Sequence, residues 1–154
     1  VLWGIITDYR RLRDEAFKWY YVPWWQQGTG PRKAMDDIQD AYQAMHGHPF
    51  TSLISAPAAA GFAELRVERT VAAHAAVEAL RMHASAHAGQ LPAQLSDITI
   101  APVPLDPSTG KPFVYSVSGR TATITSASPA GRDPQYYALH FEVTILPRNA
   151  SQAP

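Results

Sequence analysis

Apolar residues near the start of the chain recur every three or four positions, which is the spacing of one face of an amphipathic helix. The face consists of Leu2, Ile5, Ile6, Tyr9, Leu12, Ala16, Trp19 and Tyr20. Pro23 disfavours helical geometry at the residue before it, so we expect the helix to end there. Trp24 and Trp25 then fall in a connecting segment.

Two further helices are predicted before residue 90. Pro31 suits the first position of a helix, because its missing amide donor would be unpaired there in any case. The apolar face of this second helix holds Met35, Ile38, Tyr42 and Met45. The stretch from Ala58 to Ala88 is rich in Ala and contains no Pro, which predicts one long central helix with Gly89 as its C-terminal cap.

After Gly89 the period of the hydrophobic pattern changes to two, which is typical of half-buried strands. Residues 113–117 and 121–125 alternate in this way around Ser118 and Gly119, which predicts a hairpin with a tight turn. Residues 139–145 form a third alternating run. The whole pattern predicts an α+β fold, in which N-terminal helices precede one long central helix packed on a small antiparallel sheet of three to four strands.

A chain of 154 residues fits one domain with an extension. We divide it into a helical extension, residues 1–57, a helix-plus-sheet module, residues 58–148, and a tail, residues 149–154. The chain starts at Val1 without an initiator Met, so we expect it to be part of a longer polypeptide with a possible anchor upstream. The apolar run that ends at Ile6 is too short to span a membrane, which takes about 20 residues.

Composition excludes several classes of function. Lys plus Arg and Asp plus Glu are both 13, so the net charge is +0 and no nucleic-acid partner is expected. The absence of Cys excludes disulfides, a thiol nucleophile and Cys-ligated zinc. The sequence contains no phosphate-binding loop, nucleophile elbow or dinucleotide fingerprint, so we predict neither a cofactor nor an enzyme activity.

Two motifs follow the central helix and lead into the sheet. They are Gly89-Gln90-Leu91-Pro92-Ala93-Gln94-Leu95 and Leu105-Asp106-Pro107-Ser108-Thr109-Gly110-Lys111-Pro112-Phe113-Val114-Tyr115. Leu91 and Leu95 can fold back onto the helix, and the Asp106 side chain can cap amides in the turn that follows it. The residues that build these turns are Pro92, Asp106, Pro107 and Gly110.

This cassette resembles the globular part of type II secretion pseudopilins and related type IV pilin-like proteins, as found at the C-terminus of larger uncharacterised bacterial proteins. The resemblance implies a location in the cell envelope or periplasm and a role in assembly. Pseudopilins carry a Ca²⁺ loop near the end of the sheet. The corresponding loop here offers only Asp133 as a carboxylate, so no metal site is carried over.

The densest chemical feature is a group of aromatic residues, Trp19, Tyr20, Tyr21, Trp24 and Trp25. Such residues bury a large area and keep a polar tip, so they pack either in the core of their own chain or against another protein. We predict a non-enzymatic interaction module that binds a protein partner or a second copy through these residues. An extracellular ligand-binding module that uses the same aromatic residues is an alternative.

A metal-binding accessory or hydrolase domain is the other alternative. His83 and His87 stand one helical turn apart, and His74 and Glu78 repeat this spacing on the same predicted helix. Neutral imidazoles at this spacing can chelate Zn²⁺ or Ni²⁺. The competing interpretation is a helix face that carries these His residues but binds no metal ion.

Overall fold

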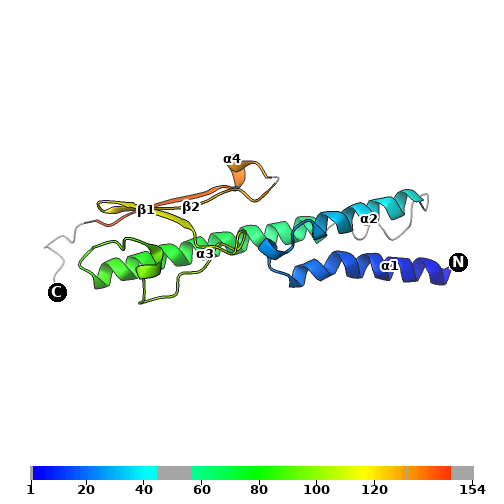
Figure 1. Cartoon of the computed structure of the whole chain (residues 1–154), viewed down its shortest axis with the longest axis horizontal. Helices are drawn as coiled ribbons and strands as arrows, with labels where there is room; N and C mark the ends of the chain where they lie inside the picture. Colours follow the sequence, from blue (N-terminus) through cyan, green and yellow to red (C-terminus); the bar gives the residue numbers. More distant parts are fainter. Residues whose placement is uncertain (1, 45–56, 131, 147–154) are drawn as a thin grey trace. The chain divides into compact units, whose positions relative to one another are not determined.

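The computed structural model describes residues 2–44, 57–130 and 132–146, and these residues form an α+β fold (Figure 1). The elements in chain order are α1 (Leu2–Phe17), η1 (Lys18–Tyr21), η2 (Trp24–Gln26), α2 (Gly30–Ala44), α3 (Pro57–Ala86), η4 (Leu95–Asp97), β1 (Val114–Ser118), β2 (Thr121–Ser126), α4 (Pro134–Tyr137) and β3 (Leu139–Thr144). None of the helices in these ranges is long and apolar enough to cross a membrane.

The chain divides into two compact units, Val1–Val67 and Glu68–Pro154, which we call the N-terminal and C-terminal units. The boundary falls within α3. The division expected from sequence, between residues 57 and 58, coincides instead with the start of α3. The long helix therefore contributes its first turns to the N-terminal unit and the rest to the C-terminal unit.

In the N-terminal unit, α1 and α2 run antiparallel (Figure 1) and pack through their predicted apolar faces. Leu12, Ala16 and Ile38 are buried together, and partly buried Tyr9 and Met35 pack against them. α1 ends at Phe17, earlier than expected, because the following residues tighten into the 3₁₀ turn η1. The predictions for the Tyr42 side chain and for Met45 lie outside the described residues.

The C-terminal unit has a three-stranded antiparallel sheet in the order β1-β2-β3, packed on α3. The helix presents small residues to the sheet, Ala72, Ala73, Ala76 and Ala79. Large side chains fill the space opposite, among them Phe113 and Ile124. Small residues on one layer and large ones on the other allow close approach without voids. Leu91 and Leu95 also pack in this core, as the sequence predicted.

The hairpin between β1 and β2 turns one residue later than expected. Ser118 pairs with Thr121, so the two-residue loop is Gly119 and Arg120 rather than Ser118 and Gly119. Gly119 has a φ of +58°, and Arg120 is not among the residues with positive φ, which is the arrangement of a type II′ turn. Glycine is favoured at the first loop position of this turn, and this preference sets the register.

The end of α3 differs from the prediction in a similar way. The amide of Gly89 donates to the carbonyl of Ala84 over 2.7 Å, which is the longer hydrogen bond of a Schellman motif. The left-handed residue at the C′ position of this motif is then Ala88, with a φ of +52°, and Gly89 follows it with a φ of +84°. The predicted cap was therefore placed one residue too late, and an alanine occupies the strained position.

We expect Ala88→Gly to raise the free energy of unfolding by about 0.5–1 kcal/mol. The left-handed conformation costs an L-residue about 1–2 kcal/mol, and the greater entropy of unfolded glycine offsets part of the gain. Urea denaturation followed by far-UV circular dichroism measures the change. The control Ala75→Gly, at an exposed position in the interior of the same helix, should lower stability by about 1 kcal/mol. If both variants changed the free energy of unfolding in the same direction, the assignment of Ala88 to the left-handed C′ position would be contradicted.

Candidate interaction surface

The predicted aromatic residues lie on two short 3₁₀ turns that join α1 to α2. Gln27 holds this segment in place, because its Nε2 donates to the carbonyls of Trp19 over 3.0 Å and Val22 over 2.8 Å. The amide of Val22 also donates to the Trp19 carbonyl, over 3.2 Å. The backbone of the segment is therefore fixed by hydrogen bonds, which sets the directions of its side chains.

Two of the five predicted side chains pack within the N-terminal unit. The Trp24 ring lies 5.9 Å from the ring of Phe62, a buried residue in the first turns of α3. The Trp19 ring lies over Gly30, where an added Cβ would come within 2.0 Å of it. Trp19 and Trp24 are half-buried and pack against their own chain, next to the core rather than within it.

The other three side chains reach the surface. Tyr21 is 90% exposed, Trp25 46% and Tyr20 37%. The ring of Phe17 stacks on that of Tyr20 at 5.6 Å and is exposed as well. We call Phe17, Tyr20, Tyr21 and Trp25 the aromatic surface. The sequence analysis did not identify Phe17 as a contact residue, because Phe17 belongs neither to the apolar face of α1 nor to the aromatic group that begins at Trp19.

The four candidate metal ligands on α3 make other contacts. The Nδ1 atom of His74 lies 2.8 Å from the Thr70 carbonyl, and its ring meets the edge of Phe141 at 5.1 Å. Glu78 forms an ion pair with Arg81 at 2.8 Å. The structure therefore brings neither side chain to the other two histidines.

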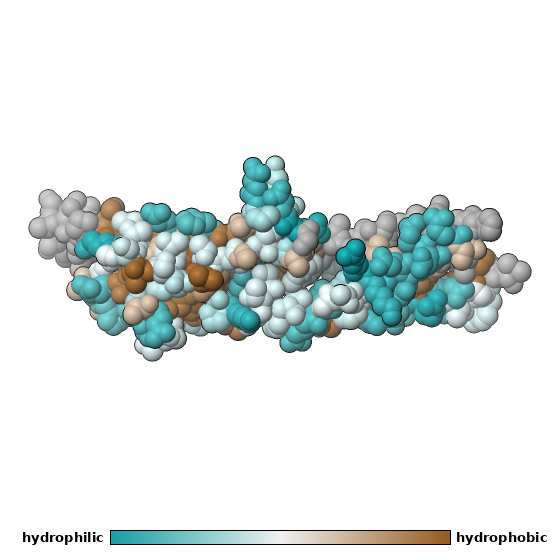
Figure 2. All heavy atoms as spheres, turned by 45° about the horizontal axis from the view of Figure 1, so that its top comes forward, coloured by the Kyte–Doolittle hydropathy of each residue, from teal (hydrophilic) through white to brown (hydrophobic). Residues whose placement is uncertain are grey.

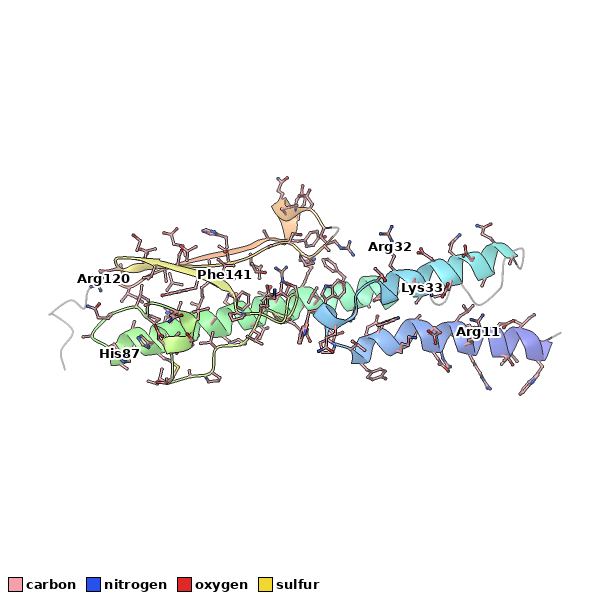
Figure 3. The ribbon with its side chains drawn as sticks, in the orientation of Figure 1. Arg11, Arg32, Lys33, His87, Arg120 and Phe141 are labelled. Atoms are coloured by element: carbon pink, nitrogen blue, oxygen red, sulfur yellow. The ribbon has the colours of Figure 1, made fainter. Side chains whose placement is uncertain are left out.

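His83 and His87 do lie together, with ring centroids 4.0 Å apart and planes 13° apart (His87 is labelled in Figure 3). The Nδ1 atom of His87 is 2.8 Å from the His83 carbonyl. An imidazole binds a metal along its ring plane, and two parallel stacked planes do not converge on one ion. In the described part of the chain, no group of three or more potential ligands could hold a metal.

The predicted turn at Asp106 is closed by an isolated β-bridge between Asp106 and Lys111, which precedes β1 in the chain. The Asp106 amide donates to the Lys111 carbonyl over 2.8 Å, and the Asp106 carbonyl accepts from Thr109 and Gly110. Gly110 has a φ of +65°, a conformation that glycine adopts without strain, which explains why glycine occupies this position. The Asp106 Oδ1 atom accepts from both the amide and the hydroxyl of Ser108, each over 2.8 Å.

The same carboxylate belongs to a buried cluster that sequence reasoning missed. Arg69 of α3 is 2% exposed, and its Nε lies 3.5 Å from the Asp106 Oδ1 atom. Its Nη1 donates to the Tyr137 carbonyl over 2.8 Å, and its Nη2 to the Ser126 hydroxyl over 2.6 Å and the Ala127 carbonyl over 2.8 Å. The Ser126 hydroxyl donates in turn to the Asp106 Oδ2 atom. The cluster ties the helix, the turn and the end of β2 together.

The exit from α3 is fixed by a second tie to the sheet. The hydroxyl of Tyr115, on β1, donates to the carbonyl of the buried Pro92 over 2.8 Å. Burial raises the pKa of the Tyr115 hydroxyl above its ordinary value of about 10, and the negative charge of Asp97 raises it further. The folded state therefore favours the neutral phenol, which is the form that can donate this bond.

We expect Asp106→Asn to lower the free energy of unfolding by about 3 kcal/mol, because it leaves the buried Arg69 charge without an anion. Asparagine keeps an oxygen for the Ser108 amide, so the turn itself is retained. The control Asp133→Asn, at the exposed start of α4, should cost less than about 0.5 kcal/mol. Urea denaturation followed by circular dichroism compares them, and equal losses would show that the ion pair contributes little.

The raised pKa of Tyr115 predicts a loss of stability at alkaline pH. The contribution of this group is fully present below the pKa of the unfolded chain, about 10, and disappears as pH rises through the folded pKa. Tyr115→Phe should therefore lower the free energy of unfolding by about 1 kcal/mol at pH 8, through the lost hydrogen bond. The difference from wild type should shrink above about pH 10. The exposed Tyr136→Phe is the control, and a pH-independent difference for Tyr115→Phe would refute the assignment.

No family model, curated protein or solved structure matches this chain.

Proposed function

We propose that the chain is a non-enzymatic structural and protein-interaction module of a larger bacterial cell-envelope or secretion-like protein. In this proposal the C-terminal unit is the pilin-like part and serves as the scaffold. The resemblance of the cassette at residues 89–95 and 105–115 to pseudopilins supports both the type of module and its location in the envelope or periplasm. The aromatic surface of the N-terminal unit makes the contact with the partner.

The exposure of Tyr21 and Trp25 is the observation that carries the proposal. Aromatic residues that reach solvent from a backbone fixed by hydrogen bonds lose little conformational entropy on binding, which is typical of interface hot spots. Trp19 and Trp24 support the same surface from within by packing against Gly30 and Phe62. The predicted contact residues thus separate into an outer group that meets the partner and an inner group that positions it.

Site-specific photocrosslinking in the host cell tests the proposal. Benzoylphenylalanine placed at position 21 or 25 should form covalent adducts with a protein on irradiation, because these side chains lie at the interface. Position 136 is the control, since Tyr136 of the C-terminal unit is also strongly exposed.

Adducts from positions 21 and 25 but not 136, with a protein identified by mass spectrometry, would support the aromatic surface. The absence of adducts at both positions would refute it. Adducts that are removed by glycosidases rather than proteases would favour the ligand-binding alternative.

A further inference from the structure

β1 is an edge strand, paired on one side only within the described part of the chain. The strand order β1-β2-β3 gives β1 and β3 one neighbour each. An unpaired edge offers a row of amide donors and carbonyl acceptors to another extended strand, and proteins commonly protect such edges with charged residues or Pro. β3 carries His140 and Glu142, whereas β1 has neither a charged residue nor Pro. Of the two edges, β1 is therefore the one open to pairing.

The register of the hairpin determines which backbone groups of β1 face its open side. In an antiparallel pair, successive residues direct their N–H and C=O groups alternately toward and away from the neighbouring strand. Ser118 and Thr121 close the two-residue turn as a hydrogen-bonded pair. The Ile145 amide donates to the Arg120 carbonyl over 2.9 Å, which directs Arg120 to β3 and the next residue, Thr121, to β1. The bonds of β1 to β2 thus come from Ser118 and every second residue before it.

Tyr115 and Val117 consequently direct their amides and carbonyls to the open side. In the part of the chain that the structure describes, no backbone group outside the sheet hydrogen-bonds to these four groups. Val117 lies on the same face of the strand as Tyr115, which packs against the core, yet Val117 is 39% exposed. A further strand beside β1 would pair the four polar groups and cover the Val117 side chain.

The outer face of β1 is uncharged as well. It consists of Val114, which is 67% exposed, and the exposed Ser116 and Ser118. Figure 2, in which the top of Figure 1 comes forward, shows pale residues of intermediate hydropathy over much of this unit, with separate brown apolar residues among them. The side chain of Arg120, after the strand, is held toward β3, because its Nε donates to the Ile145 carbonyl over 2.6 Å. Two β1 strands therefore bring no like charges of their own against each other.

One register satisfies the open sides of two copies at once. Two β1 strands that lie antiparallel about a twofold axis at Ser116 place Tyr115 of each copy opposite Val117 of the other. All four outward backbone groups of each strand are then hydrogen-bonded. The two side chains also form an aromatic and β-branched cross-strand pair, which is favourable. An axis at Tyr115 or at Val117 would instead place one of these residues opposite a residue beyond the end of β1.

We propose that β1 is an interface at which two copies of this chain pair, so that their sheets join into one sheet of six strands. A second copy is the occupant that β1 itself specifies, because the strand is complementary to its own open side. The contact is isologous and closes at the dimer. The interface uses residues of the C-terminal unit and goes beyond the proposed function, since a dimer would present two aromatic surfaces to a partner.

A single introduced thiol tests the register, because the chain contains no Cys. Ser116→Cys places two thiols directly opposite each other at the axis, in a non-hydrogen-bonded pair with Cα atoms about 4.5 Å apart, where a disulfide can form. Ser118→Cys is the matched control on the same face, since its two Cα atoms would lie about 14 Å apart. Mild oxidation of the full chain, followed by non-reducing electrophoresis, should crosslink Ser116→Cys at least tenfold faster.

Charge at the axis tests the same contact without a covalent bond. Sedimentation equilibrium should show the wild-type mass rising with concentration to that of two chains and no further. Ser116→Lys and Ser116→Glu should each weaken the dimer at least tenfold, because like charges then face each other, and an equimolar mixture of the two should restore it. His140→Lys, at an exposed position on β3, should dimerise like wild type. Circular dichroism establishes that each variant is folded.

A wild-type chain that stays monomeric, equal crosslinking of the two Cys variants, or charge variants that fail to complement each other would overturn the β1 interface. A dimer lost in Trp25→Ala but kept in Ser116→Lys would assign self-association to the aromatic surface instead. A monomer in which benzoylphenylalanine at position 116 forms adducts with another protein would replace the second copy by a strand of that protein. Adducts from positions 21 and 25 do not depend on β1, so the proposed function stands or fails separately.

Discussion

The guanidinium group of Arg69 is buried, and an ionised group in that environment requires an anion and hydrogen-bond acceptors around it. Asp106 provides the anion, and Ser126, Ala127 and Tyr137 provide acceptors. These partners come from the turn before the sheet, the end of β2 and the end of α4. A rearrangement of the turn would leave the buried guanidinium group without its anion, and a rearrangement of β2 or α4 would leave one of its N–H donors without an acceptor, so the cluster stabilises one arrangement of the C-terminal unit.

This dependence explains why the Asp106 turn is so fully hydrogen-bonded. The carboxylate accepts from Ser108 on one oxygen and from Ser126 on the other, so its position is fixed before Arg69 is considered. The alanine face of α3 then allows the sheet to approach closely enough for Ser126 to reach both charged groups. Hydrophobic packing and the polar cluster therefore specify the same spacing between helix and sheet, and such agreement between levels favours a single folded state.

The sequence predicted those features that repeat along the chain or depend on near neighbours. The apolar faces of α1 and α2, the long helix α3 and the three strands were all predicted from apolar residues that recur at a regular spacing. The packing of the helices and the pairing of the strands confirmed them. The hairpin turn and the end of α3 were each misplaced by one residue. In both cases the difference depends on which residue takes a positive φ, and at Ala88 the structure accepts strain that a local preference for glycine does not predict.

Contacts between residues far apart in the sequence could not be predicted from the local pattern of hydrophobic and polar positions. An arginine in a helix is normally taken as exposed, and nothing within a few residues of Arg69 points to Asp106 or Ser126. The pairing of Trp24 with Phe62 was hidden in the same way, because the two residues belong to different elements. The aromatic residues were therefore recognised as a group, but their separation into inner and outer members required the fold.

The N-terminal unit is held together in a different way from the C-terminal unit, and this difference bears on function. The cluster between α1 and α2 has Leu12, Ala16 and Ile38 as its buried members, while Trp3, Tyr21 and other large side chains remain exposed. Two helices of about 15 residues are marginal by themselves in water and depend on burial of an apolar face. In the proposed module, a partner that covered these exposed side chains would add burial and bind only the folded form, so association would stabilise the folded unit. The C-terminal unit adds a buried polar cluster to a larger apolar core, and this second set of contacts is what suits it to the role of scaffold in the proposed module.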